Sequence, residues 1–223
     1  MNCPLCSFSA RYLASGENRE YWLCSKCLAI FVPDRFHISQ DEEVQRYLEH
    51  ENSIENEGYV QMFQKKISIL QENFPQIKSA LDFGCGYEPV LKTLLERQGI
   101  MADGYDPNFF PDLRLDKRYD LVISTETFEH FRNPAKEVQG ITDRVIPGGL
   151  LAIMTRFYPT GDNGLLSDKF ADWYYKRDPT HIIFYCSETF KWLAKSIGFE
   201  MVFNNNHDFV VLKKPRSATG CDS

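Results

Sequence analysis

Short apolar segments alternate with amphipathic segments from about residue 79 to residue 213. The apolar segments have the length of buried strands, and the segments between them place apolar residues at helical spacing. The predicted strands span residues 79–83, 101–105, 121–124, 150–155, 200–204 and 209–213, and the predicted helices span 89–98, 134–145 and 187–197. This alternation is typical of an α/β fold with a mostly parallel sheet, and the last two strands are expected to form a hairpin at its edge.

Two further helices are predicted before the sheet. The sequence from Ser39 to Glu42 has the pattern of a capping box, which begins a helix that continues to about residue 50. Between Gly58 and Asn73 apolar residues recur at helical spacing, and Pro75 ends this second helix. Seven acidic residues between positions 39 and 60 indicate a solvated helix face.

The composition is that of a globular chain. Its 223 residues are 43% hydrophobic and carry a formal charge of -6, which disfavours a broad nucleic-acid surface. No apolar run approaches the ~20 residues of a membrane-spanning helix, so no contact with a membrane is expected. The first residues lack a basic segment followed by an apolar run, and we therefore expect a cytoplasmic protein.

Four of the seven cysteines form two pairs with the spacing of a zinc site. Cys3 and Cys6 are separated from Cys24 and Cys27 by seventeen residues. Two such pairs complete a closed tetrahedral site, so the predicted zinc is structural. A disulfide framework and redox-active pairs are the alternatives; a reducing cytosol disfavours the first, and the second usually involves a single pair.

The cysteine pairs frame a small ribbon. Tyr12-Leu13 and Tyr21-Trp22-Leu23 are predicted as short strands, with Gly16 and Asn18 supplying the turn. Because the isolated ribbon has a very small core, chelation of the zinc is expected to unfold it before the rest of the chain. The expected division is a zinc ribbon at 1–38, a helical lid or linker at 39–75, a Rossmann-like domain at 76–215 and a disordered tail at 216–223.

A glycine-containing turn follows the first predicted strand of the sheet. Gly84, Cys85 and Gly86 stand where the backbone must turn tightly and approach a ligand. Asp106 ends the second strand, twenty-two residues after Gly84, where a carboxylate can accept hydrogen bonds from both ribose hydroxyls of an adenosine. A dinucleotide-dependent oxidoreductase is the alternative, but Pro89 stands in place of its third glycine.

These motifs resemble those of class I S-adenosylmethionine-dependent methyltransferases. The resemblance covers about residues 79–213 and rests on Leu81-Asp82-Phe83-Gly84-Cys85-Gly86, Gly104-Tyr105-Asp106-Pro107, Tyr119-Asp120-Leu121-Val122-Ile123-Ser124, Glu129-His130-Phe131-Arg132-Asn133-Pro134 and Pro147-Gly148-Gly149-Leu150-Leu151. It implies a Rossmann-like sheet with an antiparallel last strand. It also implies S-adenosylmethionine over strands 1 and 2, with Asp106 on the ribose. The implied contacts to the methionine part are Asp82, Gly84, Cys85 and Gly86, and those on the pocket floor are Ser124, Thr125 and Glu126.

Two features depart from the family pattern. Glu88 stands where relatives often carry a further glycine, and it is expected either to attract the cationic ligand or to point outward at the helix start. Only thirteen residues separate Asp106 from Asp120, too few for the usual helix, strand and helix. We therefore expect the third strand to be missing, which leaves the adenine contact unassigned, with Leu113 as a candidate.

Catalytic candidates follow the fourth and fifth strands of the sheet. Glu129 and His130, near Glu126, are expected to supply a base or metal ligands; the alternative is that they cap the next helix. His181 is a second candidate base, and we expect Asp178 to orient its ring.

His181 ends an aromatic segment that begins at Trp173 and that either lines the substrate site or packs beneath the sheet with Phe184. This segment, together with Arg46, Tyr47 and His50, resembles a group of bacterial methyltransferases of largely uncharacterised function. The helices at 39–73 occupy the position of a lid in relatives, with Tyr47, His50 and Tyr59 expected either to line it or to pack.

The resemblance implies methyl transfer from S-adenosylmethionine. A small-molecule acceptor is expected because zinc-ribbon fusions occur among sugar-modifying methyltransferases and the chain is acidic. The alternatives are RNA methylation with the ribbon contacting RNA, and a non-catalytic binding module with a degenerate pocket. The acceptor atom and the oligomeric state are left open.

Overall fold

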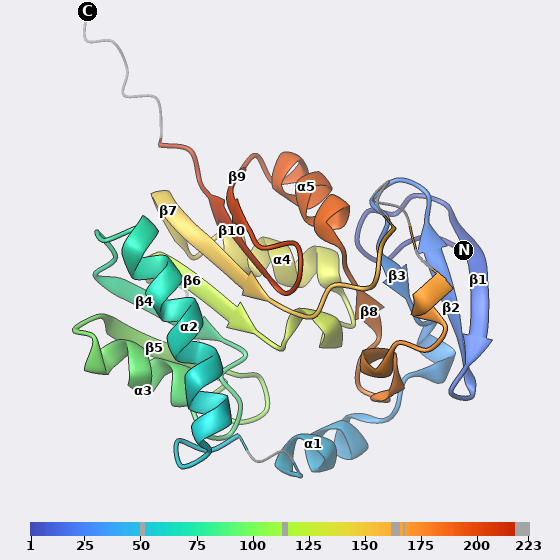
Figure 1. Ribbon diagram of the computed structural model, residues 1–223, viewed down its shortest axis with the longest axis horizontal. Helices are drawn as coiled ribbons and strands as arrows, with labels where there is room; N and C mark the ends of the chain where they lie inside the picture. The colour runs from blue at the N-terminus through green and yellow to red at the C-terminus, as the bar shows by residue number, and fades with distance from the viewer. Residues whose placement is uncertain (50–51, 113–115, 162–165, 167, 217–223) are drawn as a thin grey trace, which may run out of the picture.

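The computed structural model of the protein describes residues 1–49, 52–112, 116–161, 166 and 168–216. Its strands form two sheets, one of six strands in the order β5-β4-β6-β7-β10-β9 and one of four strands in the order β1-β2-β3-β8 (Figure 1). No helix in these described ranges is both long and apolar enough to cross a membrane.

The six-stranded sheet is mixed. Its members are β4 (Ser79–Phe83), β5 (Met101–Tyr105), β6 (Tyr119–Thr125), β7 (Val145–Met154), β9 (Glu200–Asn204) and β10 (Phe209–Lys213). The first four are parallel, whereas β10 runs antiparallel to both β7 and β9. The predicted parallel sheet with a reversed last strand and an edge hairpin is therefore confirmed.

The sheet ends at β5. Within the described residues β5 pairs only with β4, and the next strand in the chain, β6, pairs on the opposite side of β4. The expected absence of a third strand is confirmed for these ranges. Leu113, the candidate adenine contact, lies outside the described residues.

Helices cover both faces of this sheet (Figure 1). They are α2 (Glu57–Asn73), α3 (Val90–Arg97), α4 (Pro134–Thr142) and α5 (Ser187–Ser196), within three residues of the predicted ends. Successive side chains along a strand point to opposite faces of the sheet, so each face has its own apolar core. Ile123 packs with α2 and α3 on one face, whereas Val122 packs with α4 and α5 on the other.

The four-stranded sheet contains two short strands that the sequence pattern did not predict, at Ile30–Phe31 and Ile183–Phe184. It consists of β1 (Ala10–Gly16), β2 (Arg19–Cys24), β3 (Ile30–Phe31) and β8 (Ile183–Phe184). β8 comes from the segment before α5 and pairs antiparallel with β3. A two-residue strand is too short to give a period, so only the pairing across the fold reveals it.

The turn between β1 and β2 differs slightly from the prediction. Gly16 is the last residue of β1, and the two central positions are Glu17 and Asn18, both with positive φ (53° and 59°). Such a turn suits asparagine but strains glutamate. Glu17 is held there by Lys176, whose Nζ lies 2.5 Å from its carboxylate.

The cysteine segment shares a core with the larger sheet. Cys3, Cys24 and Cys27 are buried in the same apolar cluster as Phe190 of α5 and Val210 of β10. The described part of this segment is therefore not packed as a separate body. The division of the chain at residues 38, 75 and 215 stays a prediction.

The helix α1 (Gln40–Leu48) lies between α2 and the four-stranded sheet in the view of Figure 1 and buries none of its residues. Both hydrogen bonds of the predicted capping box are present, from the backbone N–H of Glu42 to Ser39 Oγ and from the N–H of Ser39 to Glu42. A helix without buried side chains depends on its caps and surface contacts, so α1 is weakly attached.

Candidate functional site

A cavity of about 740 Å³ opens where the parallel strands β4, β5 and β6 end. The loops after these three strands form one side of it, and α1 and the segment from Tyr174 to His181 form the other. Ligands of open α/β sheets bind at the carboxyl ends of the strands, so this cavity is the candidate site.

The glycine loop after β4 lines the cavity with backbone. Gly84 has a φ of 84°, and a Cβ there would collide with the side chain of Thr127. Gly86 has a φ of 67°, and a Cβ there would meet nothing within 4 Å. The N–H groups of Gly84 and Cys85 both donate to the carbonyl of Tyr105, which fixes the loop against β5. The space beside Gly86 can therefore admit a ligand against the main chain.

Asp106 also lines the cavity, at the end of β5. Its carboxylate accepts hydrogen bonds from the backbone N–H groups of Gly86 (3.2 Å), Asn108 (2.9 Å) and Phe109 (3.2 Å). A carboxylate has about four acceptor positions. Both ribose hydroxyls can consequently be bound only if one of these three backbone hydrogen bonds yields.

Asp82 and Ser124 lie outside the cavity lining, in contrast to Cys85, Thr125 and Glu126, which belong to it. Asp82 is buried, and one of its oxygens accepts from the backbone N–H of Lys92 at the start of α3. Burial raises its pKa to about 7, and the other oxygen has no hydrogen-bond partner. Ser124 Oγ is buried and also unpartnered.

Glu88 does not point outward at the start of the helix, as one of its two expected roles required. Its carboxylate accepts hydrogen bonds from Ser53 Oγ (3.2 Å) and from the backbone N–H of Ile54 (2.9 Å). It therefore ties the connection between α1 and α2 to the glycine loop. No local pattern reveals a contact between residues that are more than thirty positions apart.

Two glutamates and a tyrosine lie together behind the loop after β6. Glu126 lines the cavity with a φ of 49°, a strained conformation for glutamate, and Glu129 is fully buried. The hydroxyl of Tyr175 contacts Glu126 Oε2 (2.9 Å) and Glu129 Oε1. Burial raises the pKa of Glu126 to about 8 and that of Glu129 to about 7. Because Tyr175 has one hydroxyl proton, contact with both carboxylates requires one of them to carry a proton.

The two histidines lie beside this group. The ring of His130 is 4.9 Å from the ring of His181. His130 Nδ1 lies 3.1 Å from the carbonyl of Thr180, and His181 Nδ1 lies 2.7 Å from that of Tyr175. Burial lowers the pKa of His130, and it lowers that of His181 to about 3, so both rings are neutral at pH 7. The structure thus brings the catalytic candidates Glu129, His130 and His181 together.

Asp178 does not orient His181 as the sequence pattern suggested. Its Oδ1 accepts from the backbone N–H (2.9 Å) and the hydroxyl (2.6 Å) of Thr180. Its Oδ2 lies 3.4 Å from Arg46 of α1. The turn at 178–181 directs the carboxylate away from the ring, and the carbonyl of Tyr175 takes its place.

The aromatic segment divides between the two roles considered for it. Tyr174 and Tyr175 line the cavity. Trp173 packs instead against Phe184, with ring centroids 5.7 Å apart, in a cluster that includes Tyr21 of β2. Trp173 also contacts Tyr175, with ring centroids 5.3 Å apart, so it packs between the four-stranded sheet and the cavity lining.

Arg19, which the sequence analysis did not single out, holds the segment that carries His181. Its buried guanidinium donates to the backbone carbonyls of Lys176, Asp178 (2.8 Å), Pro179 (3.3 Å) and His181 (3.0 Å). One side chain thus supplies hydrogen-bond donors to four backbone carbonyls of this segment. A lone arginine after a turn gives no sequence signal for this role.

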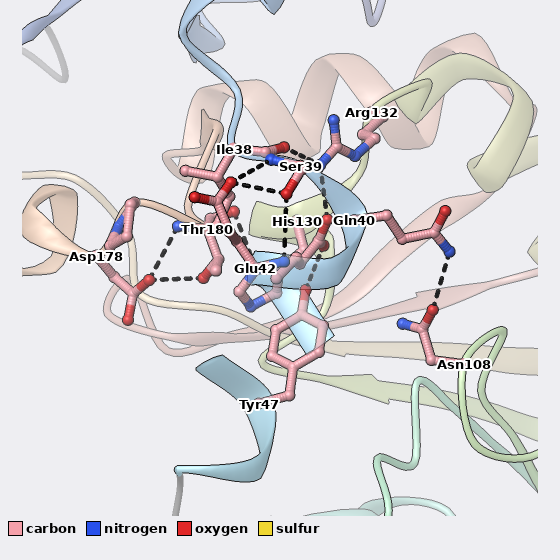
Figure 2. Close-up of polar contacts among 12 residues, drawn as sticks. Ile38, Ser39, Gln40, Glu42, Tyr47, Asn108, His130, Arg132, Asp178 and Thr180 are labelled. Carbon is pink, nitrogen blue, oxygen red and sulfur yellow. Dashed lines mark hydrogen bonds and ion pairs between the residues drawn. The ribbon is translucent and has the colours of Figure 1, made fainter. Parts of the chain in front are cut away.

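The helix α1 lies beside His130 (Figure 2). The ring of Tyr47 meets that of His130 edge to face at 5.2 Å, and its hydroxyl donates to Glu43 (2.6 Å). Arg132 donates to Glu43 (2.8 Å) and to the carbonyl of Ile38 (2.7 Å). Tyr47 and Tyr59 both line the cavity, whereas His50 lies outside the described residues.

The four cysteines of the N-terminal pairs converge. Each offers a sulfur atom within 4.8 Å of the others, with 3.6 Å between Cys3 and Cys27 and 3.4 Å between Cys6 and Cys24. Four thiolates around one zinc ion at 2.3 Å lie about 3.8 Å apart. The distances are too long for disulfides, and the donor set fits a tetrahedral ion.

Backbone geometry repeats in the two cysteine turns. The residue after the second cysteine of each pair, Ser7 or Leu28, has a positive φ of 59° or 61°. In the second turn the N–H groups of Lys26 and Cys27 point at Cys24 Sγ at 3.4 Å. Both turns are therefore shaped to present two sulfurs to one point.

Comparison with known proteins settles the family. Residues 56–203 match the family model described as a methyltransferase domain. The chain belongs to this methyltransferase family. Its Rossmann-like sheet is the fold that the resemblance to class I S-adenosylmethionine-dependent methyltransferases implied. The acceptor and the zinc stay predictions.

Solved structures share the fold at low identity. An O-methyltransferase family protein from Burkholderia thailandensis matches with a TM-score of 0.52 and 13% identity over 77% of this chain and 62% of that one. Phosphoethanolamine N-methyltransferase 2 of Haemonchus contortus, solved with S-adenosylhomocysteine, matches with a TM-score of 0.52 and 15% identity. The match covers 78% of this chain and 60% of that one. The plantazolicin methyltransferase BpumL, solved with a triazolic desmethylPZN analog and S-adenosylhomocysteine, matches with a TM-score of 0.50 and 15% identity over 80% of this chain and 92% of that one. No curated protein matches the sequence.

The cavity fits S-adenosylmethionine on its own evidence. The open space beside Gly86 is a place where a ligand can lie against the backbone. Asp106 supplies a carboxylate in the cavity lining, at the end of β5. Acceptors of this kind suit the hydroxyl and ammonium groups of the cofactor.

Proposed function

We propose that the protein transfers the methyl group of S-adenosylmethionine to a small-molecule acceptor. One observation carries the proposal. A single cavity has the glycine loop and Asp106 on one wall and Glu126, His130 and His181 on another. The cofactor and the groups that would receive an acceptor's proton thus share one enclosed space.

The cofactor is assigned to the wall formed by β4 and β5. Gly84, Cys85 and Gly86 would hold the methionine part against their backbone, and Asp106 would accept from the ribose. Thr125 and Glu126 would lie beside the reacting methyl group. When bound, S-adenosylmethionine supplies an electrophilic methyl on a sulfonium, and the residues of the chain orient it for in-line displacement.

The protein's own groups would handle the acceptor's proton. The carbonyls that face Nδ1 of His130 and His181 can only accept, so each ring keeps its lone pair on Nε2. The acceptor would lose its proton to one of these two histidines. The lone pair that this leaves on the acceptor would then bond to the methyl carbon. When bound, S-adenosylmethionine would supply the methyl group and leave as S-adenosylhomocysteine, with the electrons of the broken carbon–sulfur bond on sulfur.

A small acceptor is supported by the cover over the cluster. Glu129 and His181 are buried, and α1 places Tyr47 against His130. The net charge of -6 offers little attraction to a polyanion. Exclusion of water by such a cover also favours transfer to the acceptor rather than to solvent.

The four cysteines are assigned to one structural zinc ion. The ion would fix the turns at Cys3 and Cys24, and β2 between them carries Arg19 to the carbonyls of the segment that bears His181. The zinc-bound ribbon would thus support the catalytic cavity without contacting the substrate.

The test is transfer of labelled methyl from S-adenosylmethionine into fractionated metabolites and into total RNA. Label in the low-mass fraction is expected, with turnover lowered about 10²- to 10⁴-fold in His181→Ala and unchanged affinity for the cofactor. His37→Gln, outside the cavity lining, is the matched control. Label in RNA would replace the acceptor proposed here, and no transfer by protein that binds the cofactor would favour a non-catalytic module.

A further inference from the structure

Three potential metal ligands converge beside the cavity, apart from the cysteine cluster. A carboxylate oxygen of Glu129 and a ring nitrogen from each of His130 and His181 all lie within 4.8 Å of one another. They come from two chain segments held side by side, because the N–H of Ile182 donates to the carbonyl of Glu129 at 2.8 Å. Main-chain pairing therefore fixes the separation of the three groups.

Both imidazoles are oriented in the same way. His130 Nδ1 faces the carbonyl of Thr180 at 3.1 Å, and His181 Nδ1 faces that of Tyr175 at 2.7 Å. A carbonyl oxygen cannot donate, so the proton of each neutral ring is on Nδ1 and the lone pair is on Nε2. A hydrogen bond from one ring nitrogen to a backbone carbonyl is the usual support of a metal-binding histidine.

Glu129 brings an unsatisfied oxygen to the same place. The side chain is fully buried; its Oε1 contacts the hydroxyl of Tyr175, whereas its Oε2 has no hydrogen-bond partner. A buried acceptor without a partner is costly, which indicates a donor or cation that completes the site. A positive charge would be stabilised here, because the carboxylates of Glu126 and Glu129 both contact the hydroxyl of Tyr175.

We propose that Glu129, His130 and His181 bind a divalent transition-metal cation through one carboxylate oxygen and two Nε2 atoms. Metal–ligand distances of about 2.0–2.2 Å require the three ligand atoms to lie within about 4.4 Å of one another. One carboxylate oxygen of Glu129 and one ring nitrogen of each histidine already lie within 4.8 Å of one another. Two imidazoles favour zinc, cobalt or iron over magnesium, which prefers oxygen ligands.

The cation would be open to the cavity. Three protein ligands leave at least one coordination position, and His130 lines the cavity. This part rests on the proposed function: the acceptor would be an oxygen nucleophile that coordinates the cation, whose charge lowers the pKa of a bound hydroxyl. With both Nε2 atoms on the cation, the ionised form of Glu126, which also lines the cavity and is not a ligand, would take the proton in place of the histidines.

The test counts metal ions on the full chain, independently of methyl transfer. Purified protein is titrated with Zn²⁺ by calorimetry, and with Co²⁺ while visible absorption is recorded. About two ions per chain are expected, one with thiolate-to-cobalt charge transfer and one with only the weaker ligand-field bands of nitrogen and oxygen ligands.

Two ligand variants assign the second ion. Glu129→Gln keeps the size of the side chain, and His181→Asn can retain a donor to the carbonyl of Tyr175 while removing Nε2. Each is expected to bind about one ion, with charge transfer intact, whereas His37→Gln keeps about two. Thermal unfolding and binding of S-adenosylhomocysteine verify that the variants are folded.

The outcome is separable from the proposed function. One ion per chain in the parent, or two ions in both ligand variants, overturns the metal site even if methyl transfer is found. A second ion lost in either variant supports the site even if the protein fails to bind S-adenosylmethionine.

Discussion

The guanidinium of Arg19 donates to the backbone carbonyl of His181 at 3.0 Å, across 162 positions of sequence. Arg19 begins β2 between the two cysteine pairs, and His181 lies in the cavity lining. The ribbon and the candidate catalytic group are therefore joined by one side chain. This contact ties the backbone position of His181 to the N-terminal segment.

Removing Arg19 should loosen the segment from Lys176 to His181. Arg19→Ala leaves buried carbonyls without donors, and we expect a loss of about 2–3 kcal/mol in unfolding free energy. Turnover should fall by at least about tenfold because a small displacement of His181 misaligns the site. Urea unfolding and steady-state kinetics measure both effects. Arg11→Ala, on the exposed face of β1, is the control; equal behaviour of the two variants would contradict the link.

Loss of the cysteine-bound ion should destabilise the whole described core. The sequence predicted that chelation unfolds the ribbon first, but Cys3, Cys24 and Cys27 share a core with α5 and β10. Cys24→Ser combined with Cys27→Ser is expected to lose one zinc ion and to lower the melting temperature in a single transition. Elemental analysis and circular dichroism measure these results. Two transitions, with the second at the parent temperature, would instead show an independent ribbon.

Hydrophobic periodicity predicted the larger sheet well. Strands such as β4 and β6 are short apolar runs between turns, and the length between Asp106 and Asp120 was enough to predict the missing third strand. The glycine loop was predicted because Gly84 and Gly86 need conformations that other residues avoid. These features are encoded locally, which is why a single sequence reveals them.

The rest depends on contacts between distant positions. β8 exists because Ile183 and Phe184 find an edge at β3, and Glu88 binds Ser53 and Ile54 rather than pointing outward. The proposed pair of Asp178 and His181 was wrong because closeness in sequence does not fix the direction of a side chain within a turn. Such choices are made by tertiary packing, which a local pattern does not contain.

Asp106 should control cofactor affinity. Asp106→Asn can keep one oxygen for the backbone N–H groups of Asn108 and Phe109 but removes the charge that strengthens a hydrogen bond from ribose. We expect affinity for S-adenosylmethionine to fall about 10- to 100-fold with the fold retained. Calorimetry measures the change, and Asp143→Asn at the exposed end of α4 serves as the control. Unchanged affinity in Asp106→Asn would remove the ribose assignment.

Asp208 should make stability depend on pH. Burial favours its neutral form, but hydrogen bonds from Lys66 and Asn205 outweigh burial and lower its pKa below the usual value. Because the pKa of Asp208 is lower in the folded protein than in the unfolded chain, its carboxylate stabilises the fold at high pH. This stabilisation is complete above the unfolded-state pKa of about 4 and is lost as the pH falls through the folded-state pKa.

Asp208→Asn tests this dependence. We expect it to lower the unfolding free energy by about 1–2 kcal/mol at pH 7, because Lys66 loses its partner. The difference from the parent should shrink below about pH 4, where the parent's own carboxylate becomes protonated. Urea unfolding at several pH values measures it. A difference that stays constant from pH 7 to pH 3 would exclude the ion pair as its source.

Calorimetric titration of folded, zinc-replete protein with S-adenosylmethionine, and with S-adenosylhomocysteine as the product, tests the central claim most directly. The account predicts that both bind at micromolar concentrations with about one site per chain. Absence of binding by either ligand, in protein that unfolds cooperatively, would contradict the assignment of the cavity to the cofactor.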